Sequence, residues 1–179
     1  MPKQQFWADK TLEPKRKHRW LLYLKNAGIP SYAVKLVNKP SFAVAETEHA
    51  YFGHKFYYPG MLSWNEVSIT LVDPIDEDST GAIQDVLFNA GYRPPDDLED
   101  TSGRLYTLSK AESVDALGPI IKLEQVQSVK HGNVAVEHWK LHNPWIKDVK
   151  YGDLDYTSTD LVEITMTIRY DWATHQKLV

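Results

Sequence analysis

The sequence contains no cysteine, and none of its apolar runs approaches the length of about 20 residues that a membrane-spanning helix needs. The lack of cysteine excludes disulfides, thiolate metal ligands and cysteine nucleophiles. The N-terminal residues also lack the apolar segment of a signal peptide. These absences predict a protein that is made and kept in the cytoplasm and has no membrane partner.

A surplus of positive charge is missing as well. The chain has 20 Lys and Arg residues against 24 Asp and Glu residues, which gives a net charge of −4. Proteins that bind nucleic acid through its phosphates carry a basic footprint, so the composition does not predict one here. One basic run, PKRKHR at residues 14–19, predicts either an anion-binding patch or a solvated arm. We treat residues 1–18 as a polar basic arm and residues 19–179 as one domain.

Catalytic and metal-binding motifs are absent too. The chain has no GxSxG, no phosphate-binding glycine loop and no dinucleotide fingerprint. Asp73, Asp76 and Asp78 suggest a calcium loop, but its glycine and its bidentate glutamate are missing, so helix capping explains them better. His138 and His142 lie about 13 Å apart if they share a strand, which is too far for one zinc ion. We therefore expect no enzyme activity, no metal and no cofactor.

Aromatic residues are abundant, at 12% of the chain, and they favour strands and contact surfaces. Side-chain alternation predicts strands over residues 19–25, 32–37, 63–73, 120–129 and 133–142. We expect the first two to form a hairpin around the turn at residues 26–30. Residues 145–150 are expected to cross over to the last strand.

The stretch 162–172 predicts one long C-terminal strand of about eleven residues with two different faces. Its apolar parity comprises Val162, Ile164, Met166, Ile168, Tyr170 and Trp172. Its polar parity comprises Glu163, Thr165, Thr167, Arg169 and Asp171. A strand of this length at the end of a chain predicts that it completes a sheet, within one subunit or across several.

A helical period replaces the alternation at residues 79–90, with Ser79 or Thr80 as the N-cap and Gly91 after the C-terminus. Residues 110–117 allow a second, brief helix. The aromatic-rich insertion at residues 40–58 is followed by a predicted turn at Pro59 and Gly60. It is either a subunit contact or an irregular hairpin packed on a core of its own. The fold class predicted is mainly β with one packed α-helix.

Three stretches carry a family resemblance in chain order: AYFGHKFYYPGMLSWNEVSITLVDP at residues 50–74, LHNPWIKDVKYGDLDYTSTD at residues 141–160 and LVEITMTIRYDWA at residues 161–173. They resemble the tail tube protein family of contractile-tailed bacteriophages, which is related to the tube protein of type VI secretion. The second stretch departs from the family at Pro144 and Trp145, which reverse the commoner Trp-Pro order.

The resemblance implies an antiparallel β-sandwich or half-barrel with a flanking helix. It also implies hexameric rings whose sheets join into one ring-wide β-barrel, and a stacked tube that conducts the phage genome. The implied partners are further copies of the chain, the tail sheath protein, the tape measure protein, a baseplate tube initiator, and phage DNA that passes without sequence preference. The implied location is the virion tail. A baseplate-proximal tube initiator is the alternative role within the same fold.

Two sets of residues are candidates for such an assembly. The wall of a wet lumen needs polar side chains, and the candidates, if these faces do not point outward instead, are Glu66, Ser68, Thr70, Glu163, Thr165, Thr167 and Arg169. The candidates for contact between subunits are Tyr51, Phe52, Phe56, Tyr57 and Tyr58. Two alternatives from other classes stay open: a monomeric carbohydrate-binding β-sandwich with exposed Trp and Tyr platforms, and a small β-barrel hydrolase that uses Asp or Glu.

Overall fold

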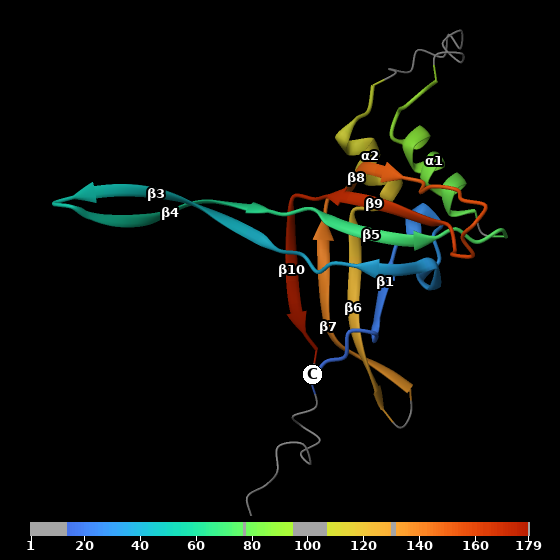
Figure 1. Ribbon diagram of the computed structural model, residues 1–179, viewed down its shortest axis with the longest axis horizontal. Helices are drawn as coiled ribbons and strands as arrows, with labels where there is room; N and C mark the ends of the chain where they lie inside the picture. Colours follow the sequence, from blue (N-terminus) through green and yellow to red (C-terminus); the bar gives the residue numbers. More distant parts are fainter. Residues whose placement is uncertain (1–13, 77, 95–106, 130–131, 179) are drawn as a thin grey trace, which may run out of the picture.

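The computed structural model describes residues 14–76, 78–94, 107–129 and 132–178. These residues form two four-stranded sheets, in the orders β1-β6-β7-β10 and β2-β5-β9-β8, and a two-stranded sheet of β3 and β4 (Figure 1). The strands are β1 (Trp20–Tyr23), β2 (Val34–Val37), β3 (Phe42–Tyr51), β4 (His54–Trp64), β5 (Val67–Val72), β6 (Ile120–Val129), β7 (Gly132–His142), β8 (Trp145–Lys150), β9 (Glu163–Arg169) and β10 (Trp172–Lys177). The helices are α1 (Ser79–Asn89) and α2 (Lys110–Leu117).

The core lies between the two four-stranded sheets, whose strands cross steeply (Figure 1). Alternation decides which side chains enter it, because successive residues of a strand point to opposite faces. In β5 and β9 the apolar parity is buried, and Ile69 lies opposite Met166 in the register. The facing sheet contributes buried Leu22, Ile121 and Leu141 from three of its strands. All described strand pairs are antiparallel, so the predicted fold class is confirmed, and α2 lies at residues 110–117, where the sequence allows a second, brief helix.

The predicted long C-terminal strand is in fact two strands in different sheets. β9 pairs with β5 and β8, whereas β10 pairs with β7. Tyr170, between them, is buried, and the backbone N–H of Asp171 donates to the carbonyl of His142 at 3.0 Å. This corner lets one apolar stretch serve both walls of the core, as occurs where sheets pack at a large angle.

The predicted N-terminal hairpin is also wrong, because β1 pairs with β6 and β2 pairs with β5. Two short 3-10 helices, Lys25–Ala27 and Ser31–Ala33, carry the chain from one sheet to the other. Leu24 and Ile29 are both buried there and form an isolated bridge. Because these side chains are buried in the core, the segment between β1 and β2 turns from one sheet into the other and does not form a local hairpin.

Residues 145–150 form the strand β8, where the sequence predicts a crossover. β8 pairs with β9, and Val149 lies opposite Met166. Ile146 and Val149 pack against the core, so this short segment does have an apolar face, interrupted by a bulge between Ile146 and Asp148. The bulge breaks the alternation that would have revealed the strand.

The helix α1 begins and ends close to the predicted residues. Its N-cap is Asp78 rather than Ser79 or Thr80, and the Asp78 carboxylate accepts from the backbone N–H of Gly81 at 2.8 Å. Asp73 accepts from the backbone N–H of Ser79 at 3.0 Å and from the hydroxyl of Thr80 at 2.7 Å. These carboxylates satisfy N–H groups that have no partner inside the helix. Two members of the acidic cluster therefore cap the helix, as the sequence predicts.

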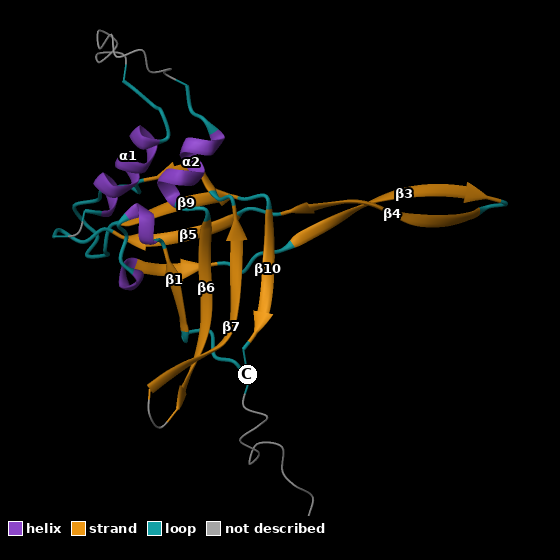
Figure 2. Cartoon of the chain, turned by 180° about the vertical axis from the view of Figure 1, so that it is seen from behind, coloured by secondary structure: helices purple, strands orange, loops and turns teal. Residues whose placement is uncertain are grey.

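The strands β3 and β4 form a hairpin that projects far beyond both sheets (Figures 1 and 2). Every residue of the two strands is exposed except Trp64, so the hairpin has no core of its own. Its turn lies at Phe52 and Gly53, which have φ of 48° and 74°. Pro59 and Gly60 are not the predicted turn, because they lie inside β4 at a shift of the register. There a Cβ on Gly60 would lie 3.1 Å from the carbonyl oxygen of Ala45.

Candidate assembly interface

The predicted polar residues of β5 and β9 lie together on the face of their sheet that points away from the core. Ser68 is paired with Thr167 and Thr70 with Thr165, and their neighbours in sequence fill the core. The neighbouring strands extend this face with Leu36 from β2 and with Asp148 and Lys150 from β8. The structure thus brings the candidate lumen residues together, and whether they line a lumen stays a prediction.

The charges of this polar face neutralise one another. Glu66 accepts from Lys147, and the guanidinium of Arg169 lies 3.6 Å from the same carboxylate oxygen. Glu163 accepts from Lys35 at the other end of the face. Each of the two carboxylates predicted for this surface, Glu66 and Glu163, therefore has a cationic partner.

The same sheet ends in two edge strands, β2 and β8, and each of them pairs with one neighbour only among the described strands. Unpaired N–H and C=O groups along an edge favour pairing with another chain. Successive strands of the sheet are antiparallel, and their number is even. A copy rotated about an axis along the strands would therefore bring its β2 antiparallel to β8.

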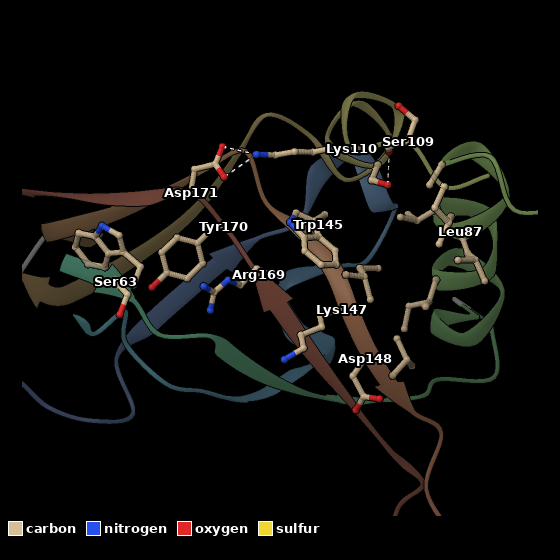
Figure 3. Close-up of a pocket in the computed structure, with 18 of the residues that line it drawn as sticks. Ser63, Leu87, Ser109, Lys110, Trp145, Lys147, Asp148, Arg169, Tyr170 and Asp171 are labelled. Atoms are coloured by element: carbon tan, nitrogen blue, oxygen red, sulfur yellow. Dashed lines mark hydrogen bonds and ion pairs between the residues drawn. The ribbon is translucent and has the colours of Figure 1, made fainter. Parts of the chain in front are cut away.

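A groove of about 980 Å³ runs beside β8, between this strand and the two helices (Figure 3). Trp145 lies between Tyr170 and Leu87 of α1 in this view. Ile83, Val86 and Val149 add further apolar surface to the lining. The groove therefore offers apolar contact next to a free strand edge. On the opposite edge of the sheet, β2 exposes Leu36, and Tyr32 nearby is 70% exposed.

The predicted contact residues of the hairpin fall on two different faces. Tyr51, Phe56 and Tyr58 lie on one face. They belong to the first, third and fifth cross-strand pairs counted from the turn, and alternate pairs of a hairpin share a face. Tyr57 lies on the other face, opposite Glu48 in the register. The carboxylate of Glu48 forms an ion pair with the ammonium of Lys55 on that same face. Phe52, at the turn, is 84% exposed. The hairpin thus has one aromatic face and one partly charged face.

A buried carboxylate lies near the base of the hairpin. Glu137 of β7 is 4% exposed and accepts from Lys39, which precedes β3, at 2.5 Å. Lys15 of the N-terminal arm also bonds to it, and the imidazole of His175 lies 3.3 Å away. Burial alone raises the pKa of the Glu137 carboxyl, but the hydrogen bonds from Lys15, Lys39 and His175 outweigh it and lower the pKa to about 2. Sequence reasoning missed this site, although a Glu on the apolar parity of β7 was a signal for it.

The remaining candidates for chemistry do not come together. His138 is buried, while His142 stacks on Trp172 at 4.8 Å and contacts Thr174. In the described parts of the chain, no group of three or more His, Asp and Glu residues is placed to hold a metal ion. No described helix is long and apolar enough to cross a membrane. Of the basic arm, residues 1–13 lie outside the described residues.

Over the described residues, the architecture is that of an antiparallel β protein with two four-stranded sheets whose edge strands pair on one side only, and with a projecting hairpin. No protein-family model matches the sequence, and no curated protein gives a significant match. Solved structures do match. A chain of the sheath/tube terminator of the PVC extracellular contractile injection system has a TM-score of 0.59 and 14% identity, over 92% of this chain and 97% of that chain.

Two further structures agree. A chain of the baseplate of the anti-feeding prophage (AFP) has a TM-score of 0.58 and 14% identity, over 92% of this chain and 97% of that chain. A chain of the PVC sheath–tube complex has a TM-score of 0.56 and 15% identity, over 92% of this chain and 93% of that chain. The protein therefore has the fold of subunits found in contractile injection systems, which confirms the resemblance at the level of the fold.

Proposed function

We propose that this chain is a structural subunit of the tube of a contractile tail, which assembles into stacked hexameric rings. The observation that carries the proposal is the four-stranded sheet β2-β5-β9-β8, which has a polar outer face, free edges at both sides and strand directions that allow closure. The fold shared with chains of contractile injection systems supports it. A tube initiator at the baseplate is the second candidate, favoured by the likeness to a chain of a baseplate structure.

In the proposed ring, β2 of one subunit pairs with β8 of the next, and the six sheets form one barrel. Closing the sheet removes edges that would otherwise promote aggregation. Tyr32, just before β2 of the incoming edge, brings apolar surface to the groove beside β8, while Leu36 stays on the polar face beside Thr70. Burial of apolar surface contributes about 25 cal/mol per Å², so this contact adds to the backbone hydrogen bonds.

The polar face of the sheet lines the lumen in this proposal, and the phage genome passes through it. Each phosphate that a cation neutralises adds affinity by counterion release, so a basic wall would retain DNA. Ion pairs such as Lys147 with Glu66 and Lys35 with Glu163 limit that effect. The tube would be surrounded by the sheath protein, would enclose the tape measure protein, and would begin at the baseplate initiator in the virion tail.

The hairpin makes the contact between rings in this proposal. Its aromatic face, with Tyr51, Phe56 and Tyr58, is exposed in the single subunit and projects well beyond the sheets. Aromatic side chains are enriched at the centres of protein interfaces. Tyr57 on the other face would contribute separately, next to the pair of Glu48 with Lys55.

Purified protein is expected to form rings or tubes with an open central channel in electron micrographs, because two sheet edges and an aromatic hairpin are left for other copies. The carbohydrate-binding alternative predicts the opposite: a monomer whose Trp fluorescence changes with added oligosaccharide. A stable monomer at high protein concentration would contradict the proposed function. Tubes without a channel would contradict the assignment of the lumen.

The orientation of the polar face can be tested by cysteine labelling, because the natural chain has no cysteine. In assembled tubes, Thr167→Cys is expected to react with a small maleimide but not with a maleimide carried on a long polyethylene glycol chain. Gln176→Cys, on an exposed position of β10 in the other sheet, serves as the matched control and should react with both reagents. Equal labelling of both sites by the long reagent would show that the face of Thr167 points outward.

A further inference from the structure

The short segment that leads into the hairpin is tied to both large sheets. Asn38 exchanges hydrogen bonds with the backbone of Ser68 in β5, at 3.3 and 2.5 Å. The next residue, Lys39, reaches the other sheet, where its ammonium lies 2.5 Å from Glu137 of β7 and 2.7 Å from the side chain of Gln125 in β6. The two sheets are thus joined through adjacent residues just before β3 begins.

The second strand of the hairpin has its own anchor. Trp64, the last residue of β4, packs edge-on against Phe42 at 5.5 Å and lies 6.1 Å from the ring of Tyr170, at the corner between β9 and β10. The backbone N–H of Asn65 donates to the carbonyl of Ser41 at 2.8 Å. Beyond these contacts the residues of both strands are exposed, so the direction of the hairpin is decided at its base.

We propose that Glu137 is a positioning residue that fixes the direction of the hairpin through Lys39. The carboxylate is buried on the core-facing parity of β7, and Lys15, Lys39 and His175 surround it. Buried ion pairs are costly to desolvate and contribute little net stability when the alternative is apolar packing, so the role assigned to this one is to fix geometry. Lys39 has two acceptors on two adjacent strands, so its position is defined in two directions.

The consequence for assembly rests on the proposed function, in which the hairpin contacts another ring. A hairpin held in one direction pays less conformational entropy on docking than one that swings about its base. The same carboxylate binds Lys15, so the N-terminal arm and the base of the hairpin share one anchor. Loss of the Lys39 contact is therefore expected to weaken assembly without unfolding the subunit.

The direction of the hairpin can be measured by pulsed electron paramagnetic resonance. Spin labels are attached at Ala50→Cys on the hairpin and Gln176→Cys on β10, in protein diluted until sedimentation shows monomers. We expect a narrow distance distribution in the otherwise natural chain and at least a twofold broader one in Lys39→Gln. Lys39→Arg, which keeps the charge and the donors, is expected to restore the narrow distribution. Lys140→Gln, on the opposite parity of β7, is the matched control.

A width in Lys39→Gln equal to that of the control would overturn the proposal, and so would equal broadening in both variants. Thermal unfolding of each variant separates direction from stability, since Lys39 is half-exposed and its replacement leaves Lys15 and His175 on the carboxylate, so the melting temperature should fall less than in Glu137→Gln. The distance measurement needs only monomers. If the protein forms no rings, the proposed function fails while the role of Glu137 and Lys39 is still decided by the distance distribution.

Discussion

A proline placed in β8 is expected to abolish ring formation while leaving a folded monomer. Proline has no N–H to donate and its ring obstructs a strand that pairs from that side. Neighbouring residues of a strand direct their N–H groups to opposite edges. We therefore expect one of the two variants Asp148→Pro and Val149→Pro to disturb the free edge of β8, and the other to disturb its pairing with β9.

The edge-directed variant should reduce the assembled fraction at least tenfold in sedimentation, because every joint in the ring repeats the same defect and each lost backbone hydrogen bond contributes about 1 kcal/mol. Its melting temperature should stay close to that of the natural monomer. The other variant should melt earlier, since it breaks the β8–β9 ladder within the subunit. Normal assembly by both variants would show that β8 is not a joint between subunits.

Glu137→Gln is expected to lower the free energy of unfolding at pH 7 by about 2–3 kcal/mol. The natural carboxylate is buried and accepts from two lysines and a histidine, and hydrogen bonds to charged groups contribute more than neutral ones. The neutral amide keeps the shape of the side chain but loses the attraction to the cations. Urea unfolding of the natural protein and of Glu137→Gln measures the difference in the free energy of unfolding, provided that both transitions have the same dependence on urea concentration.

The difference should depend on pH in a defined direction. The pKa of the Glu137 carboxyl falls from its ordinary value of 4.5 to about 2 on folding, so the unfolded chain takes up the proton first as the pH drops. The stabilisation is therefore fully present above the ordinary value and is lost as the pH falls toward 2. Glu48→Gln, at an exposed ion pair with Lys55, is the control and should change stability by less than about 0.5 kcal/mol.

A loss in Glu137→Gln that stays constant from pH 7 to pH 2 would contradict the ion-pair explanation and point to packing instead. A loss no larger than that of Glu48→Gln would show that the buried carboxylate contributes no net stability. Neither outcome bears on the direction of the hairpin, which is decided by the distance measurement on Lys39→Gln.

The sequence predicts those features that depend on local periodicity. The alternation of Val67, Ile69 and Leu71 identifies the buried face of β5, because side chains alternate along any strand whatever its partner. The helical period and the acidic residues before it place α1, because capping involves residues only a few positions apart. The polar faces of β5 and β9 are likewise visible in the sequence, and the structure puts them on one surface.

The periodicity of the sequence does not determine which strands pair with each other. The same alternation fits a local hairpin of β1 with β2 and the observed pairing of each with a distant strand, and only packing of Leu24 and Ile29 into the core selects the second. Pro59 and Gly60 favour a turn by composition, yet a bulge in a projecting strand uses the same conformational properties.

The apolar stretch at residues 162–172 shows most clearly what the sequence determines and what only the tertiary structure decides. Its alternation by itself determined that Ile164, Met166 and Ile168 are buried and that the threonines between them are not. Only the tertiary structure decided that the stretch bends at Tyr170 and enters a second sheet, because that corner depends on contacts with the carbonyl of His142 and with Trp64 from other parts of the chain. The position of Glu137 has the same origin, since Lys15, Lys39 and His175, which bond to its carboxylate, come from segments far away in sequence.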